Sequence, residues 1–265
     1  MKYPRARKRF GQHFLEPVWV AKLIDCLDPR HDETFLEIGP GRGALTRPLA
    51  ARVRGIIAVE IDRDLAASLP ATLPPNVRVI QGDILTADLQ DLLRGEPIPV
   101  RVVGNLPYNI SSPILFKLLE DAGEGRVLSD ATLMLQSEVA DRLTARVGTG
   151  SYGSLAIQVA LYADVERVLA LPPGAFRPLP KVSSTVVRLR FRPRVVDVGE
   201  PAAFERVVRG VFLRRRKTIL NALKPVADSA GRSAAQVLQQ AGVEPSRRPQ
   251  TLTLDEMARL SRAVL

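Results

Sequence analysis

The stretch Phe35-Leu-Glu-Ile-Gly-Pro-Gly-Arg-Gly-Ala44 joins a short apolar run to a loop with three glycines, and a helical pattern follows over residues 45–53. Short apolar runs bounded by glycine are typical of buried strands, whereas the spacing after Ala44 is typical of a helix. Glycines let a ligand approach the backbone closely, and a helix N-terminus supplies free N–H groups. The stretch therefore predicts a strand, a glycine loop and a helix that together bind a ligand.

Strands and helices alternate on both sides of this loop. A helix is predicted over residues 17–27, because its apolar positions recur at helical spacing after Pro17. Further strands are predicted at 56–59, 77–81, 102–105, 131–136 and 185–191, and further helices at 113–119 and 137–143. Strands separated by helices imply an α/β fold with a parallel, doubly wound sheet.

Four consecutive strands of this sheet end in a glycine or a polar residue, namely Gly39, Glu60, Asp83 and Asn105. Ligands of such sheets bind beyond the carboxyl ends of the strands, so these residues point to one site. An acidic residue 21 positions after Gly39, as Glu60 is, suits a ribose diol. The glycine loop alone can also be read as a dinucleotide fingerprint with Ala44 in its last place, which keeps an NAD enzyme among the alternatives.

The strand that ends at Asn105 continues into Leu106-Pro107-Tyr108. Pro107 has no N–H and disfavours helical geometry at Leu106, so the carbonyl groups here are expected to point outward. With the side-chain carbonyl of Asn105 and the flat ring of Tyr108, the tetrapeptide suits a planar substrate with an amino group, such as an extruded nucleobase. An ordinary strand followed by a proline turn is the alternative.

Composition and charge favour a nucleic-acid partner. The chain has 265 residues, 38 Lys and Arg against 28 Asp and Glu, a net charge of +10 and a pI near 10.3. Residues 198–265 alone carry twelve basic and six acidic residues, and their densest cluster is Arg214-Arg-Arg-Lys217. We expect this cluster to bind the phosphates of a nucleic acid. The alternative is a basic surface that contacts only solvent.

Two terminal regions flank the sheet. A basic arm, with five Lys and Arg over residues 2–9, runs into Phe10-Gly-Gln-His-Phe-Leu15 and is expected to fold over a site. A linker over residues 192–201 separates a domain at residues 1–193 from a helical domain at residues 198–265.

Several function classes are not expected. Cys26 is the one cysteine, which excludes a disulfide framework and a cysteine metal site and fits a reducing cytoplasm. His13 and His31 are the only histidines and neither has a ligand partner nearby in sequence, so no metal site is expected. No apolar stretch approaches the ~20 residues that a membrane span requires, and the start lacks the apolar core of a signal peptide.

The motifs together resemble those of the KsgA-type ribosomal RNA adenine dimethyltransferases. The resemblance covers nearly the whole chain, in family order. It rests on residues 10–15, 37–43, 59–62, 82–83, 104–108, 137–143, 152–153, 175–183 and 214–218.

The resemblance implies a Rossmann-like S-adenosylmethionine domain followed by a small all-helical domain. It also implies transfer of two methyl groups to the exocyclic N6 amine of each of two adjacent adenosines near the 3′ end of 16S rRNA in the small ribosomal subunit. We expect such a protein to be a cytoplasmic monomer without membrane contact.

Carried over by position, the resemblance assigns residues to the cofactor and to the target base. His13, which stands where the family usually has asparagine, and Leu15, Gly39, Gly41, Glu60, Asp83 and Asn105 are expected around S-adenosylmethionine. Glu60 can accept hydrogen bonds from both ribose hydroxyls and Asp83 from the cofactor's adenine amine.

The predicted mechanism follows from a weak nucleophile, because the lone pair of the target nitrogen is delocalised into its ring. Acceptors from Asn105 and from the Leu106 or Pro107 carbonyl would hold the amino hydrogens and direct the lone pair at the methyl carbon. Tyr108 would stack on one face of the base and, as the resemblance implies, Phe176 on the other, with a core ring as the alternative for Phe176.

Three other functions stay open at the level of the sequence. A related resistance methyltransferase that acts on large-subunit RNA is the first, although the C-terminal Arg-Arg-Lys-Thr and the long helical tail favour the small-subunit enzyme. An RNA-binding assembly or transcription factor without catalysis is the second, and an intact Asn-Leu-Pro-Tyr argues against it. The NAD dehydrogenase is the third, and it lacks a visible hydride-transfer acid.

Overall fold

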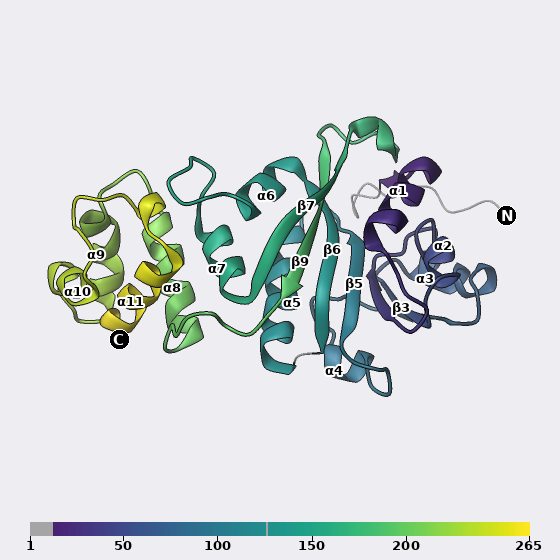
Figure 1. The fold of residues 1–265 in the computed structure, drawn as a ribbon, viewed down its shortest axis with the longest axis horizontal. Coiled ribbons are helices and arrows are strands. Elements are labelled where there is room, and N and C mark those ends of the chain that lie inside the picture. Colours follow the sequence, from purple (N-terminus) through teal and green to yellow (C-terminus); the bar gives the residue numbers. More distant parts are fainter. Residues whose placement is uncertain (1–12, 126) are drawn as a thin grey trace. The chain divides into compact units, whose positions relative to one another are not determined.

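The computed structural model describes residues 13–125 and 127–265, which form two compact units (Figure 1). The sheet unit comprises Met1–Ala140 and Asp164–Arg192, and the helical unit comprises Asp141–Ala163 and Pro193–Leu265. The basic arm predicted over residues 2–9 lies outside the described residues.

The sheet unit is built on seven strands in the order β4-β3-β2-β5-β6-β9-β7. Their bounds are β2 Thr34–Ile38, β3 Gly55–Glu60, β4 Val77–Gln81, β5 Val100–Asn105, β6 Leu128–Gln136, β7 Ala163–Leu171 and β9 Ser184–Phe191. The accompanying helices are α1 Pro17–Leu27, α2 Thr46–Ala50, α3 Arg63–Ser68, α4 Leu89–Leu92, α5 Ser111–Gly125 and α6 Ser137–Leu143. The α/β class predicted from the sequence is confirmed.

Two local predictions are wrong. The sheet is parallel from β4 to β6, but β9 pairs antiparallel with β6, so the sheet is mixed rather than wholly parallel. An antiparallel edge on a parallel sheet is common, and a strand's apolar pattern does not encode its direction. The helix predicted over residues 45–53 is only Thr46–Ala50, because the chain turns at residues 51–54 to enter β3.

Register brings the carboxyl ends of β2, β3 and β5 side by side. Ile38 lies opposite Val59 on β3 and opposite Gly104 on β5. A Cβ atom at Gly104 would lie 2.9 Å from the Ile38 carbonyl oxygen, which is closer than non-bonded atoms tolerate. Glycine at position 104 therefore allows β5 to approach β2 where the functional residues begin.

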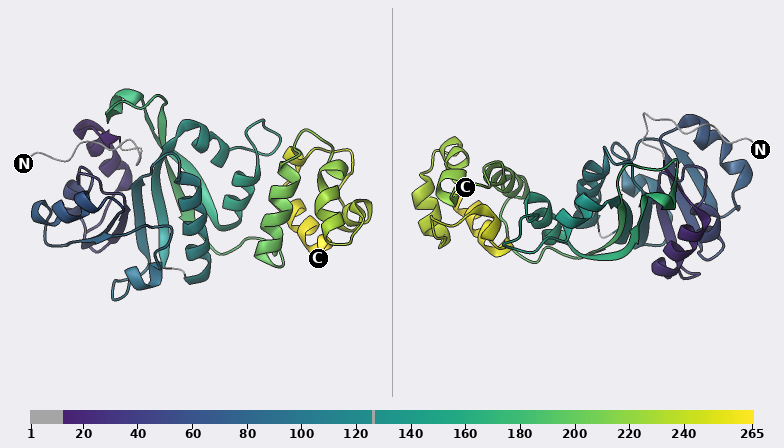
Figure 2. Two further views of the ribbon diagram at one scale, coloured as in Figure 1. Left: turned by 180° about the vertical axis from the view of Figure 1, so that it is seen from behind. Right: turned by 90° about the horizontal axis from the view of Figure 1, so that it is seen from above.

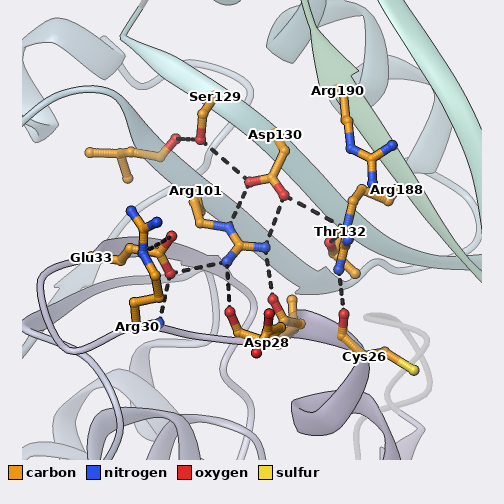
Figure 3. A network of polar contacts seen from close by, with 12 residues as sticks. Cys26, Asp28, Arg30, Glu33, Arg101, Ser129, Asp130, Thr132, Arg188 and Arg190 are labelled. Carbon is orange, nitrogen blue, oxygen red and sulfur yellow. Dashed lines mark hydrogen bonds and ion pairs between the residues drawn. The ribbon is translucent and has the colours of Figure 1, made fainter.

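At the opposite end of the strands, where β5 and β6 begin, a network of charged side chains connects the sheet to α1 (Figure 3). Arg101 at the start of β5 makes two hydrogen bonds with the Asp130 carboxylate, at 2.9 and 3.0 Å, and one with Glu33 at 3.0 Å. Its guanidinium also donates to the Leu27 carbonyl at the end of α1. Burial opposes ionisation, but these partners hold the pKa of Arg101 above its usual value. Arg188 on β9 joins the network through Asp130 and the Cys26 carbonyl.

The helical unit consists of α7 to α11, coloured green to yellow except for the teal α7, and Figure 2 gives two further views. The bounds are α7 Ser154–Tyr162, α8 Pro201–Phe212, α9 Ile219–Ser229, α10 Ala234–Ala241 and α11 Leu254–Val264. Apolar side chains of all five helices form one core, to which α7 contributes Ala156, Ile157 and Leu161. The helix α11 begins with a capping box, in which Thr253 and Glu256 exchange side-chain to backbone hydrogen bonds.

Among the described residues, no helix is both long and apolar enough to cross a membrane.

Candidate active site

A cavity opens in the sheet unit where β2, β3 and β5 end. The short segment before α1 forms one wall, and the glycine loop and the residues after β5 form the others. The lining residues are His13, Phe14, Leu15, Glu37, Gly39, Pro40, Gly41, Ala44, Leu45, Glu60, Ile61, Asn105, Leu106, Pro107, Tyr108 and Met134. The structure thus brings together nine of the residues singled out from the sequence.

The glycine loop and Glu60 are joined by hydrogen bonds. Glu60 Oε2 accepts from the Gly41 N–H at 3.0 Å, and its Oε1 accepts from the Asp62 N–H at 2.9 Å. Gly41 has φ +59°, and a Cβ atom there would lie 3.1 Å from the Phe14 ring, so both conformation and space favour glycine. These contacts fix the Glu60 carboxylate at the end of β3.

Burial raises the pKa of Glu60, although its backbone hydrogen bonds act in the opposite direction. The two carboxylate oxygens together keep acceptor capacity beyond their backbone contacts. The group can therefore still accept the two hydroxyls of a ribose.

Asp83 also lies at this edge of the sheet, just after β4, but it does not line the cavity. Its Oδ1 accepts the Leu85 N–H at 2.9 Å, in an Asx turn. A role for Asp83 toward the cofactor's adenine stays a prediction.

Asn105 ends β5 and contacts the segment before α1. Its Nδ2 donates to the His13 carbonyl oxygen at 2.7 Å. The His13 ring stacks on Tyr108, with centroids 5.8 Å apart and planes inclined by 21°, and its Nδ1 donates to the Pro178 carbonyl at 2.7 Å. His13 therefore connects three parts of the chain that are far apart in sequence.

Tyr108 is held by its hydroxyl, which is hydrogen-bonded to Ser184 Oγ at 2.8 Å. Its ring face already accommodates one flat partner, the His13 imidazole. The Pro107 carbonyl accepts the Ile110 N–H at 3.1 Å in the turn that leads to α5. Of the two backbone carbonyls predicted to face a substrate, that of Leu106 is therefore the better candidate.

Phe176 is not brought to this cavity. Its ring is 0% exposed and belongs to the apolar core with Leu15 and Ala175. The reason is a long-range pairing, in which β1 (Phe14–Leu15) and β8 (Phe176–Arg177) form a two-stranded antiparallel sheet. Phe176 is therefore a core side chain in this structure, which was the alternative to a stacking role. The ring could stack on a base only if it became accessible.

Sequence reasoning did not single out Glu37 as a functional residue, although it lines the cavity beside Gly39 and Glu60. Burial raises the pKa of Glu37 to about 7; a hydrogen bond with the Thr46 side chain acts in the opposite direction, and the nearby charge of Glu60 adds to the rise. The signal available in the sequence was a carboxylate inside the apolar run at residues 35–38, which the structure buries as part of β2.

The donor set fits S-adenosylmethionine. Glu60 offers acceptors to a ribose, the loop at Gly39 and Gly41 leaves room for a ligand near the backbone, and Glu37 offers a negative charge to a cationic group. Among residues 13–125 and 127–265, no cluster of three or more His, Cys, Asp or Glu side chains could hold a metal ion.

Comparisons of sequence point to one family. A family model described as ribosomal RNA adenine dimethylase matches residues 4–260. Two relatives are each named ribosomal RNA small subunit methyltransferase A. That of Geobacter metallireducens is 44% identical over 98% of this chain and 96% of the relative. That of Acinetobacter baylyi is 42% identical over 97% of this chain and 92% of the relative.

Comparisons of structure agree. A dimethyladenosine transferase from Plasmodium falciparum superposes with a TM-score of 0.76 at 26% identity, and 94% of this chain and 96% of that chain are covered. The 23S rRNA methyltransferase ErmE superposes with a TM-score of 0.64 at 30% identity, with 95% and 99% covered.

Proposed function

The chain belongs to the ribosomal RNA adenine dimethylase family, and on that premise we propose that the cavity at the ends of β2, β3 and β5 is its active site. The protein is an S-adenosylmethionine-dependent methyltransferase. It transfers methyl groups to the N6 amines of two adjacent adenosines near the 3′ end of 16S rRNA in the small ribosomal subunit.

The orientation of the Asn105 amide is the observation that carries this assignment. A carbonyl oxygen only accepts hydrogen bonds, so the contact of Asn105 with the His13 carbonyl must use Nδ2. The side-chain oxygen Oδ1 is then the other end of the same planar group and stays an acceptor. An acceptor with a fixed direction is what an adenine amine needs.

Adenine N6 is a weak nucleophile, and it becomes reactive when its lone pair is directed at the methyl group. In the first transfer Asn105 Oδ1 and the Leu106 carbonyl would each accept one N6 hydrogen, which leaves the lone pair directed away from both oxygens; in the second transfer one N6 hydrogen remains for one of the two acceptors. Both acceptors also stabilise the positive charge that develops on nitrogen during transfer. S-adenosylmethionine supplies an electrophilic methyl carbon when bound.

The face of the Tyr108 ring that does not stack on His13 would supply the stacking surface for the target adenine. The Tyr108 hydroxyl is hydrogen-bonded to Ser184, so the ring is already oriented before a base arrives. A pre-oriented ring loses little conformational freedom when a base stacks on it. The excess proton would leave through water after transfer, since no base is required before the methyl group has moved.

The helical unit would bind the RNA. Arg214, Arg215, Arg216 and Lys217 are all exposed and follow α8, and they line a surface hollow together with Asn221 and Lys224. Backbone phosphates are recognised by such clusters. The domain division predicted from the sequence, residues 1–193 and 198–265, leaves residues 141–163 on the wrong side, since they belong to the helical unit. We assign catalysis to the sheet unit and RNA binding to the helical unit, and we propose that the protein acts as a cytoplasmic monomer.

The large-subunit alternative is less well supported. Relatives named for the small subunit reach 44% identity, whereas the 23S rRNA methyltransferase ErmE reaches 30%. The NAD alternative lacks support from any of these comparisons.

The function is tested with labelled S-adenosylmethionine and small subunits that lack the modification. We expect label in 16S rRNA, released as N6,N6-dimethyladenosine on nuclease digestion and identified by mass spectrometry. Large subunits and fully modified small subunits are the controls. Label in large subunits alone would favour the resistance-type activity, and no label in either RNA would favour a factor without catalysis.

A further inference from the structure

The loop that joins β8 to β9, residues 178–183, is tied at both ends to side chains that line the cavity, and we call it the rim loop. At its start, His13 Nδ1 donates to the Pro178 carbonyl at 2.7 Å. Just after its end, Ser184 Oγ is hydrogen-bonded to the Tyr108 hydroxyl at 2.8 Å. The rim loop therefore lies directly beside the site proposed for the target adenine.

The rim loop exposes two apolar side chains. Leu179 is 59% exposed and Val182 is 43% exposed, whereas Pro180 between them is buried. Pro180 and the Ser183 carbonyl, which accepts the Ser137 N–H at 3.0 Å, hold the loop against the sheet unit. Scattered apolar side chains are ordinary on a protein surface, but two in one fixed loop next to a ligand cavity indicate contact with another molecule.

Positive charge accompanies these apolar side chains. Lys181 in the rim loop is exposed, and the side chain of Arg177, at the end of β8, is 60% exposed. Arg177 pairs with Glu16 at 3.7 Å, an exposed pair of the kind that contributes little stability. A surface with apolar and cationic side chains together suits a nucleotide, because its base has flat apolar faces and its phosphate is negative.

The nucleotide next to the target adenosine comes within reach of this loop. A base in the cavity is joined to its neighbours by single phosphodiester groups, so a neighbour has to lie within one nucleotide of Tyr108. Val182 stands two residues before Ser184, the hydrogen-bond partner of Tyr108. Leu179 directly follows the residue that His13 contacts. Two residues of extended chain span at most about 7 Å, so both apolar side chains lie close to the path of the RNA.

We propose that the rim loop binds the second adenosine of the substrate pair while the first occupies the cavity, an inference that rests on the proposed function. Leu179 and Val182 would cover a flat face of its base, and Lys181 would lie beside its phosphate. Extrusion of one adenosine removes the stacking partner of the next and leaves an apolar face exposed. Proteins that open a base step commonly place an apolar side chain such as leucine at the opening.

Such a site can hold the neighbour before and after its own methylation. Leucine and valine side chains contact the face of a base and make no hydrogen bonds to its edge, where the N6 group lies. Methyl groups added at N6 leave that face intact. Binding at the rim loop should therefore depend on the presence of a base rather than on its methylation. This suits a substrate in which each adenosine of the pair is the neighbour of the other.

Three RNA substrates test the proposal in a double-mutant cycle. The first is the small subunit that lacks the modification. The other two are the same subunit reconstituted with 16S rRNA in which one or the other target adenosine is replaced by an abasic nucleotide. Initial rates of methyl transfer give the KM for each substrate, and calorimetry gives the affinity for S-adenosylmethionine.

The variants separate the apolar contact from general surface effects. Wild type is compared with Leu179→Ser, and with Leu179→Phe, which keeps an apolar side chain. Ile98→Ser is the matched control, because Ile98 is also 59% exposed but lies two residues before β5, at the opposite end of that strand from Asn105. Circular dichroism checks that each variant is folded.

On intact pairs, Leu179→Ser should raise the KM for the RNA roughly five- to tenfold, because most of an apolar contact is lost. Leu179→Phe and Ile98→Ser should keep the wild-type KM, and cofactor affinity and turnover at saturating RNA should not change in any variant. On at least one abasic substrate, wild type should already show the raised KM, and Leu179→Ser should add less than about twofold. The abasic position that shows this coupling identifies whether the loop holds the 5′ or the 3′ neighbour.

Two outcomes would overturn the role of the rim loop. One is a wild-type KM for Leu179→Ser on intact pairs. The other is an equal rise in KM on all three substrates, which would place Leu179 against another part of the RNA. In both cases wild type still methylates small subunits, so the proposed function stands. Absence of methyl transfer from wild type to intact pairs would instead overturn the proposed function.

Discussion

Asn105 Nδ2 donates a hydrogen bond to the His13 carbonyl at 2.7 Å, although 92 positions separate the two residues in sequence. The contact fixes which end of the amide faces the cavity. In the proposed active site it would also make the segment before α1 part of the catalytic geometry, because the orientation of the acceptor depends on the backbone at His13.

Replacement of Asn105 by alanine should lower turnover on the order of a hundredfold, because one positioned acceptor is lost. The melting temperature should change little, since the side chain is only partly buried. Methyl transfer to small subunits and thermal denaturation provide the measurements. Asn105→Asp is the matched variant: it keeps an acceptor but sets a carboxylate oxygen against the His13 carbonyl, so its turnover should also fall. Wild-type turnover in a folded Asn105→Ala protein would refute the acceptor role.

Tyr108 offers a test that separates its ring from its hydroxyl. Tyr108→Phe removes the bond to Ser184 but keeps the stacking face, so turnover should fall less than tenfold. Tyr108→Ala removes the face and should lose about 1–3 kcal/mol of base stacking, seen as a higher KM for the RNA. Equal effects of the two substitutions would mean that the ring does not stack on the base.

Glu37 should make the folded state less stable as pH rises. Its folded pKa, about 7, is above the value of 4.5 expected when unfolded, so the folded protein holds a proton that the unfolded chain releases. Stability therefore falls between pH 4.5 and about pH 7, by up to roughly 3 kcal/mol. Glu37→Gln should remove this fall and should raise the melting temperature at pH 8 more than at pH 4.5. An equal shift at both pH values would show that ionisation of Glu37 is not the cause.

The basic cluster after α8 should govern affinity for RNA. Replacement of Arg214, Arg215 and Arg216 by glutamine should weaken binding to small subunits and reduce its salt dependence by up to about three counterions. Affinity for S-adenosylmethionine should not change. The same substitution at three exposed arginines of the sheet unit, Arg52, Arg63 and Arg94, controls for net charge. Equal salt slopes for the two triple variants would mean that the cluster is a solvated surface.

Arg101 should matter for stability rather than for chemistry. Arg101→Leu leaves Asp130 without its two-bond partner in a site where both side chains are 12% exposed, so unfolding should become easier by roughly 3 kcal/mol. Arg190→Leu, which breaks an exposed pair with Glu166, should cost under about 1 kcal/mol. Denaturant titrations measure both, and similar small losses would show that the buried network does not contribute as argued.

Sequence reasoning predicted those parts of the proposed site that depend on local signals. Glycines at 39 and 41, the acid at the end of β3 and the Asn105 tetrapeptide each follow a strand, and the parallel register of β2, β3 and β5 necessarily gathers them. What it could not supply were contacts set by distant partners. The burial of Phe176 depends on pairing with Leu15, and the direction of β9 depends on β6, neither of which leaves a periodic trace nearby.

The segment between β6 and β7 has a consequence for how this protein could be divided or recombined. Residues 141–163 precede the linker, yet α7 packs its apolar side chains among those of the C-terminal helices. A cut at residue 193 would leave Ala156, Ile157 and Leu161 of one fragment without the core they fill and open that core in the other. To exchange the helical unit between relatives, two segments would therefore have to be replaced together, residues 141–163 and residues 193–265. We expect these two segments to have been inherited together.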